Sequence, residues 1–138
     1  MLISQHYYMK LVMRLAAIYN IIWGAWVVLF PSHFFNWANI AVPSYLGIWQ
    51  SVGMIVGVYG LGYWCSSYNV YIHWPIIMVG YLGKIFGPIG FLWALNRGQI
   101  APQFGYINIT NDLIWLLPFS LILLNVYKAN KFSLCSIK

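Results

Sequence analysis

The segment LAAIYNIIWGAWVVLF, residues 15–30, opens a stretch that contains no Lys, Arg, Asp or Glu before Lys84. Soluble domains carry charge on about 25% of their residues, whereas this chain is 6% charged and 62% hydrophobic. A soluble protein could not leave so much of its surface uncharged. The composition therefore predicts a protein whose surface faces lipid.

The apolar sequence is divided into four segments by proline, glycine and small polar residues. A helix needs about 20 apolar residues to cross the hydrocarbon core of a bilayer. We expect the four spans at residues 11–30, 44–64, 72–95 and 107–127. Pro88 and Pro118 lie inside the last two spans and predict kinks there. The expected fold is all-α, a single domain over residues 1–138 that forms an integral membrane four-helix bundle.

Basic residues lie mostly at the two ends of the chain, although Arg97 falls in the loop between the third and fourth spans. The terminal basic residues are Lys10, Arg14, Lys128, Lys131 and Lys138. Lys and Arg are enriched on the cytoplasmic side of membrane proteins, so both termini should be cytoplasmic. The same distribution forms no basic patch, which argues against nucleic-acid binding. The bilayer itself is the expected partner.

Glycines recur at three- and four-residue steps in the second and third spans. They are Gly53, Gly57, Gly60, Gly80, Gly83, Gly87 and Gly90. Stripes of small residues let helix backbones approach closely in lipid. We expect the second and third spans to pack on each other through these stripes. Use of one stripe in a homodimer or a larger membrane complex is the alternative.

Lys84 lies near the middle of the third span, where insertion of a charge costs about 2.5–3.5 kcal/mol. Asp112, the only acidic residue, lies in the fourth span. A short loop joins these spans, so antiparallel contact between them is expected. Three interpretations stay open: a buried ion pair that fixes the register, an ion or ligand site that uses both groups, or an acid near the outer headgroups that favours a helix start.

Three amide side chains accompany these charges at similar depths. Gln50 and Asn111 lie in the outer half of their spans, and Asn20 lies near the middle of the first. Together with Lys84 and Asp112 they outline a polar pocket entered from outside. Interhelical hydrogen bonds explain each amide equally well, and we favour that explanation for Asn20.

Three stretches carry a family resemblance: RLAA at 14–17 and on to Pro31, LGKIFGPIG at 82–90, and TNDLIW at 110–115. They resemble small bacterial four-span proteins that are similar to the DoxX-like membrane proteins. The resemblance implies a four-helix bundle in a bacterial inner membrane. It also implies an association with quinone-linked oxidoreductases, of which some DoxX-related proteins are subunits. No catalytic motif of that group matches this chain residue by residue.

We expect a non-enzymatic accessory or ligand-binding component of the membrane, with an outward-facing polar pocket. The first alternative is a quinone-linked redox subunit, in which Lys84 and Asp112 lie near a quinone carbonyl and Trp93 or Trp115 stacks on its ring. The second is a proton-coupled carrier, in which Asp112 titrates and the protein is a dimer. The two cysteines lack metal-ligand spacing, and no metal is expected.

Overall fold

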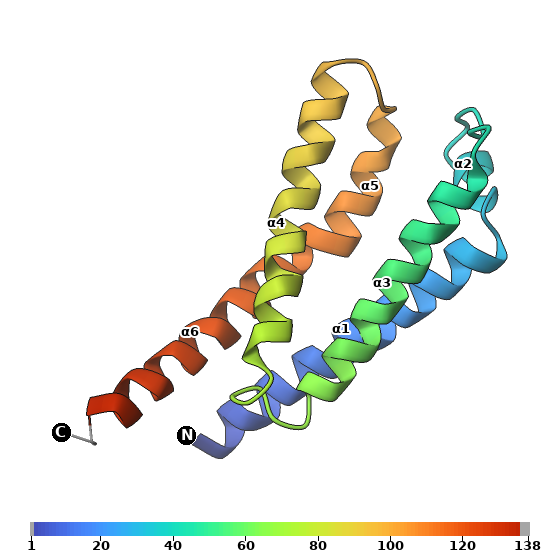
Figure 1. Ribbon diagram of the computed structural model, residues 1–138. Coiled ribbons are helices and arrows are strands. Elements are labelled where there is room, and N and C mark those ends of the chain that lie inside the picture. The colour runs from blue at the N-terminus through green and yellow to red at the C-terminus, as the bar shows by residue number, and fades with distance from the viewer. Residues whose placement is uncertain (1, 136–138) are drawn as a thin grey trace.

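The structure is a computed structural model that describes the backbone of residues 2–135 and the side chains of residues 6–130. In this part the protein consists of helices and the loops that join them. The elements are α1 (Leu2–Leu29), α2 (His33–Trp37), α3 (Leu46–Ser66), α4 (Trp74–Asn96), the 3-10 turn η1 (Pro102–Phe104), α5 (Gly105–Asn108), the π-helical segment η2 (Ile109–Leu113) and α6 (Ile114–Cys135). Figure 1 shows two long hairpins, α1 with α3 and α4 with the chain from α5 to α6. The predicted all-α class is confirmed.

Three segments are long and apolar enough to cross a membrane. They are His6–Leu29, Trp74–Asn96 and Pro102–Asn130, and they overlap the first, third and fourth predicted spans. The helix α3 corresponds to the second predicted span and has 21 residues, but it is not one of the three. It carries no charged side chain, yet glycine, tyrosine, tryptophan and glutamine lower its hydropathy.

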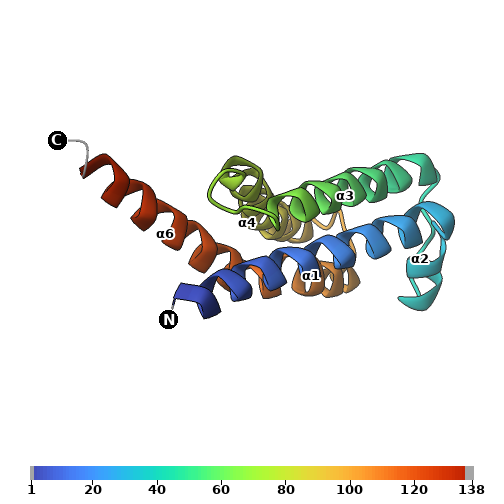
Figure 2. The same cartoon turned by 90° about the horizontal axis from the view of Figure 1, so that it is seen from below.

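The glycines of α3 lie against α1, which corrects the expected contact between the two glycine stripes. A Cβ atom on Gly24 of α1 would lie 2.5 Å from the carbonyl oxygen of Gly53. A Cβ atom on Gly60 would lie 2.9 Å from the carbonyl oxygen of Ala17. In Figure 2, α1 and α3 run side by side along their length. Gly24 is the residue of α1 that lies against the glycines of α3, and the sequence analysis did not single it out.

The two hairpins meet over a core in the half of the molecule that contains the chain ends. Met9 and Met13 of α1, Ile77 of α4, and Phe119 and Ile122 of α6 are at most 1% exposed. Tyr63 joins α3 to α4 in this region because its ring lies directly over Gly80, where no Cβ atom blocks the approach. The contact between α3 and α4 thus includes a ring over one glycine, and a Cβ atom on Gly62 of α3 would lie 3.0 Å from the side chain of Ile76 in α4.

A cluster of aromatic rings covers the opposite end of the molecule. Phe34 and Phe35 of α2 are each 3% exposed. The ring of Phe104 in η1 lies 5.1 Å from that of Phe34 and 5.9 Å from that of Trp49 in α3. Such edge-to-face contacts stabilise aromatic clusters beyond their buried area. The outer aromatic cluster, Phe34, Phe35, Trp49 and Phe104, therefore ties α2, α3 and η1 together.

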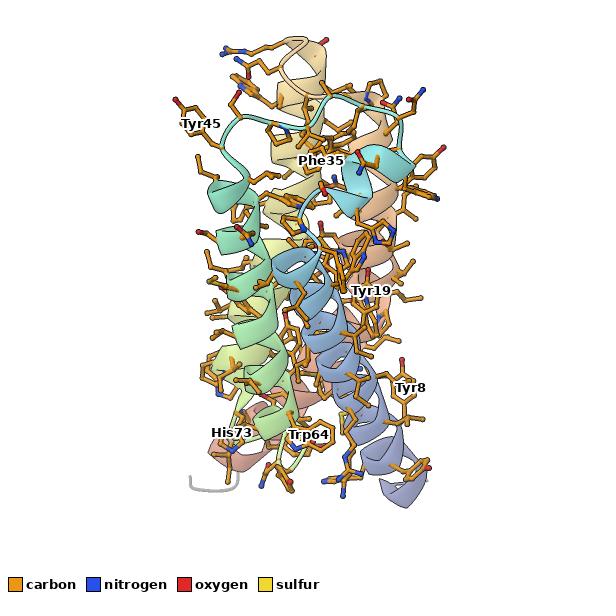
Figure 3. All side chains as sticks on the ribbon, turned by 90° about the vertical axis from the view of Figure 1, so that its right-hand side faces the viewer. Tyr8, Tyr19, Phe35, Tyr45, Trp64 and His73 are labelled. Carbon is orange, nitrogen blue, oxygen red and sulfur yellow. The ribbon has the colours of Figure 1, made fainter. Side chains whose placement is uncertain are left out.

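The last helical region bends, since the chain changes direction between α5 and α6 (Figure 1). The π-helical η2 occupies this bend, and Pro118 lies one turn further along inside α6. The start of α1 and the end of α6 lie at the same end of the molecule, as do Trp64 and His73, whereas Phe35 and Tyr45 lie at the other (Figure 3).

The predictions that concern the last residues fall partly beyond these helices. Lys138, which contributed to the predicted orientation, lies outside the described residues, and so does the side chain of Lys131.

Candidate ligand-binding site

A pocket of about 230 Å³ lies between α1, α3, α4 and η2. Its lining residues are Asn20, Ile55, Val56, Tyr59, Tyr63, Gly80, Gly83, Lys84, Gly87, Asn111 and Asp112. Four of the five polar residues predicted to form a pocket therefore surround one space, and the fifth, Gln50, lies elsewhere. Both hairpins contribute to the pocket, because Asn20 comes from the first while Lys84, Asn111 and Asp112 come from the second.

Lys84 is 4% exposed and has a backbone partner. Its Nζ donates a hydrogen bond to the carbonyl oxygen of Asn111 over 2.6 Å. Three rings surround the same nitrogen, with centroids at 5.8 Å for Tyr63, 6.0 Å for Trp115 and 5.7 Å for Phe119. A cation within about 6 Å of a ring centroid is attracted by the ring quadrupole. One carbonyl and three rings thus replace the hydration of the ammonium group.

The expected ion pair between Lys84 and Asp112 is not the contact that the structure has. Among the described residues, the hydrogen-bond acceptor of Lys84 is the Asn111 carbonyl, and no nitrogen–oxygen contact within 4.0 Å joins Lys84 to Asp112. The register of α4 against the following hairpin arm is therefore set by a backbone contact. The carboxylate stays nearby as a wall of the same pocket.

The Asn111 carbonyl belongs to the π-helical segment η2. At the end of η2 the N–H of Ile114 bonds to the carbonyl of Ile109, five residues earlier. π-Helical turns widen a helix locally and occur often at functional sites. The segment also holds Asn111 and Asp112, so the irregular turn and the polar residues of the pocket coincide.

Asp112 is 9% exposed and lies over Gly87 of α4. A Cβ atom at Gly87 would lie 2.8 Å from Asp112 Oδ2, so a larger residue there would displace the carboxylate from its present position. The other carboxylate oxygen, Oδ1, accepts a hydrogen bond from Asn111 Nδ2 over 3.3 Å. This bond fixes which end of the Asn111 amide faces the acid.

Two buried amide oxygens in the pocket have no hydrogen-bond partner among the described residues. They are Asn20 Oδ1 and Asn111 Oδ1. Asn20 is only 3% exposed. The interhelical bond that the sequence analysis favoured for Asn20 is therefore not made by its oxygen. Leaving such an acceptor unpaired costs about 1–3 kcal/mol.

Gln50 makes an interhelical hydrogen bond, which was the other interpretation of the amide side chains. Its Nε2 donates to the carbonyl oxygen of Val28 in α1 over 2.8 Å, which is an ordinary interhelical hydrogen bond. The residue points across the tight interface between α1 and α3 and lines no part of the pocket. Gln50 is thus removed from the candidate site.

The glycines predicted to pack helices differ in what lies beside them. Gly53 and Gly60 contact α1, and Gly80 and Gly87 receive the side chains of Tyr63 and Asp112. Gly57, Gly83 and Gly90 have no atom within 4 Å of an added Cβ position. The backbone of Gly57 nevertheless lies beside Gly24, whereas Gly83 borders the pocket.

Aromatic residues of the site were missed or assigned differently by the sequence analysis. The sequence analysis did not assign Tyr63 to the site, yet its side chain is only 2% exposed and packs on Phe119, with ring centroids 5.1 Å apart. Trp115 lies beside Lys84, as the redox hypothesis required. Trp93 does not, because it is 63% exposed and its ring lies 4.5 Å from the guanidinium carbon of Arg97.

No protein-family model, curated protein sequence or solved structure matches this chain. The resemblance to DoxX-like proteins therefore stays a prediction.

Proposed function

We propose that the chain is a four-span protein of a bacterial inner membrane, with α3 as its second span and both termini in the cytoplasm. Its 21 residues make α3 about 30 Å long, which matches the hydrocarbon thickness. It also runs beside α1 (Figure 2). Lys10 and Arg14 belong to the first half of α1 and Lys128 to the second half of α6, and the start of α1 and the end of α6 lie at the same end of the molecule (Figure 1), as a cytoplasmic end requires.

We propose that the function of the protein is to bind a small ligand, without chemical change, in the pocket around Lys84. One observation carries this proposal: a buried cation, a buried acid and two amide oxygens without partners surround the same space. Polar groups inside a membrane are costly and mark functional sites by default. A bound ligand that pairs with the two oxygens would recover the free energy that their burial costs.

The side chains that line the pocket favour binding over covalent catalysis. They include no serine, cysteine or histidine, and the one carboxylate that could serve as a base, Asp112, accepts a hydrogen bond from Asn111 Nδ2. Lys84, the one amine, is engaged by the Asn111 carbonyl and three rings. Assembly as a homodimer or within a larger membrane complex stays a prediction.

The test is purification of the protein from its native membrane, followed by mass spectrometry of the small molecules that accompany it. Asn20→Leu removes one unpaired oxygen from the pocket. Gln50→Leu is the matched control, since it removes a half-buried amide from the same helix pair outside the pocket. We expect the wild type and Gln50→Leu to retain a common molecule, and Asn20→Leu to retain about tenfold less.

The measurement can contradict the proposal in two ways. No specific molecule accompanies the wild type, or Asn20→Leu and Gln50→Leu retain it equally. Either result would separate the buried polar residues from ligand binding.

A quinone-linked subunit is the second candidate, because Trp115 and Tyr63 lie beside the Lys84 amine. The hydrogen bonding favours it less well. Quinone carbonyls accept hydrogen bonds, and the unpaired pocket atoms, Asn20 Oδ1 and Asn111 Oδ1, are acceptors as well. Identification of a quinone in the extract described above would favour this candidate.

A further inference from the structure

The border of the pocket is formed by residues in the middle of α3 and α4. Ile55 of α3 is 58% exposed, and Gly83 and Gly87 of α4 are exposed as well. All three line the pocket. Gly83 has open space where a side chain would begin. The side of the molecule between α3 and α4 therefore leaves the pocket uncovered at mid-helix depth.

Both ends of the molecule are covered. The outer aromatic cluster closes the end near α2, where the rings of Phe34 and Phe104 lie 5.1 Å apart. The buried side chains of Tyr63, Ile77 and Phe119 fill the half that contains the chain ends. A path along the helix axes, such as the entry from outside that the sequence analysis expected, meets packed rings. A path from the side meets Gly83.

The unpaired groups of the pocket define what a ligand must offer. Asn111 Nδ2 faces the Asp112 carboxylate, so rotation of this amide would place two oxygens against each other, and Oδ1 is fixed as the unpaired end. Asn20 Oδ1 is unpaired as well. The positive charge of Lys84 is directed toward a carbonyl and three rings. The two unpaired atoms of the pocket are therefore both hydrogen-bond acceptors, which a ligand can pair only by donating.

The charges of the pocket favour a neutral ligand. Lys84 and Asp112 contribute one basic and one acidic group, and a charged ligand would add a net charge at the depth where charge is most costly. A hydroxyl group is a neutral donor that is small enough for about 230 Å³. Entry from the lipid side requires an apolar remainder.

We propose that the pocket binds the hydroxyl end of a neutral lipophilic alcohol, which enters from the bilayer between α3 and α4 and donates its one proton to Asn20 Oδ1 or Asn111 Oδ1. This inference rests on the proposed ligand-binding function and names the ligand class and its route. The apolar part of the alcohol lies along the exposed side of Ile55 and Gly83.

The test uses a long-chain alkanol that carries a photoreactive diazirine, together with its methyl ether, which is of similar shape but cannot donate. The full-length protein in phospholipid nanodiscs is labelled with each probe, and the labelled peptides are mapped by mass spectrometry. We expect the alcohol to label the residues around Ile55 and Gly83 saturably. The ether should need about tenfold higher concentration, because it cannot make the one hydrogen bond that the alcohol donates to a buried acceptor.

The route is tested with Gly83→Leu, which fills the border of the pocket without removing a polar group. Gly90→Leu is its control: it lies two turns further along α4, has the same open surroundings and does not line the pocket. We expect Gly83→Leu to reduce labelling by the alcohol about tenfold and Gly90→Leu to leave it unchanged. Circular dichroism and the elution volume establish that both variants are folded.

The outcomes separate this inference from the function on which it rests. Equal labelling by alcohol and ether would overturn the ligand class but leave a ligand-binding pocket. Equal effects of Gly83→Leu and Gly90→Leu would overturn the lateral route. If neither probe labels the pocket saturably, this inference fails, whereas the proposed function is decided by the mass spectrometry of co-purified molecules described above. The comparison of alcohol with ether needs no variant and so does not depend on how Gly83→Leu folds.

Discussion

Lys84 lies near the middle of the third predicted span and also lines the candidate site. An ammonium group at this depth needs polar contact, and the chain supplies it from the backbone: the Asn111 carbonyl accepts at 2.6 Å. The rings of Tyr63, Trp115 and Phe119 add attraction for the cation without adding a charge. Because a carbonyl stays in place when other side chains change, this lysine should depend little on the carboxylate beside it.

A double-variant cycle measures that independence. Lys84→Met removes the donor from the Asn111 carbonyl, and we expect it to lower the free energy of unfolding by about 1–3 kcal/mol. Adding Asp112→Asn should leave this loss in place, since the direct partner of the lysine is the carbonyl. The free energies are obtained from denaturant titrations of wild type, single and double variants in the same lipid–detergent mixture.

The alternative gives the opposite pattern. Restoration of stability in the double variant would mean that Lys84 and Asp112 act as a buried ion pair, because removing both charges then eliminates an uncompensated one. Asp112→Asn alone controls for any effect of the acid on its own contact with Gly87.

Polar residues of the site could be predicted from sequence for a simple physical reason. Within long apolar helices, Asn20, Lys84, Asn111 and Asp112 are conspicuous because lipid has no partners for them. Gln50 gives the same signal, but its amide meets the Val28 carbonyl on another face of the bundle. Which face a residue occupies depends on helix packing. The π-helical turn at 109–113 has no signal that composition or spacing could have supplied.

Among the contacts between helices, the interface between α1 and α3 depends on glycine. A Cβ atom at Gly24 would fall within 2.5–3.0 Å of backbone atoms of Gly53 and Gly57, which cannot rotate away. Helix–helix association in lipid relies on such close packing. The sequence marked the glycines of α3 but not their partner, because Gly24 stands alone in the first span and a lone glycine draws no stripe.

Gly24→Ala should therefore force α1 and α3 apart. We expect a loss of about 1–3 kcal/mol in the free energy of unfolding, the usual effect of overpacking. Gly47→Ala is the matched control on α3, because nothing lies within 4 Å of its added Cβ, and it should be neutral or slightly stabilising. Thermal unfolding of both variants in detergent distinguishes them. A loss for Gly47→Ala as large as that for Gly24→Ala would contradict the close contact.

The orientation of the whole molecule is open to a direct test with a natural reporter. Cys65 is an exposed thiol near the end of α3. Gln99 lies in the loop between α4 and η1 at the opposite end of α4. In a Cys135→Ser background, we expect a membrane-impermeant maleimide to label Cys65 only after lysis. In a variant that combines Cys65→Ser, Cys135→Ser and Gln99→Cys, labelling should occur in cells whose outer membrane is permeabilised.

The reversed pattern would place both termini outside the cytoplasm. If Cys65 and the thiol introduced by Gln99→Cys were labelled from the same side, α4 would not cross the bilayer. The test thus establishes whether α4 crosses the bilayer and which of its ends faces the cytoplasm.

Because the pocket takes Asn20 from the first hairpin and Lys84, Asn111 and Asp112 from the second, it exists only once the two halves have come together. During biosynthesis the first half can insert and close on itself through Gly24 and Gly53 before the second has left the ribosome. A ligand bound in the pocket as proposed would then hold the two hairpins together. Its availability in the bilayer would set how much newly made protein reaches the assembled state and escapes degradation.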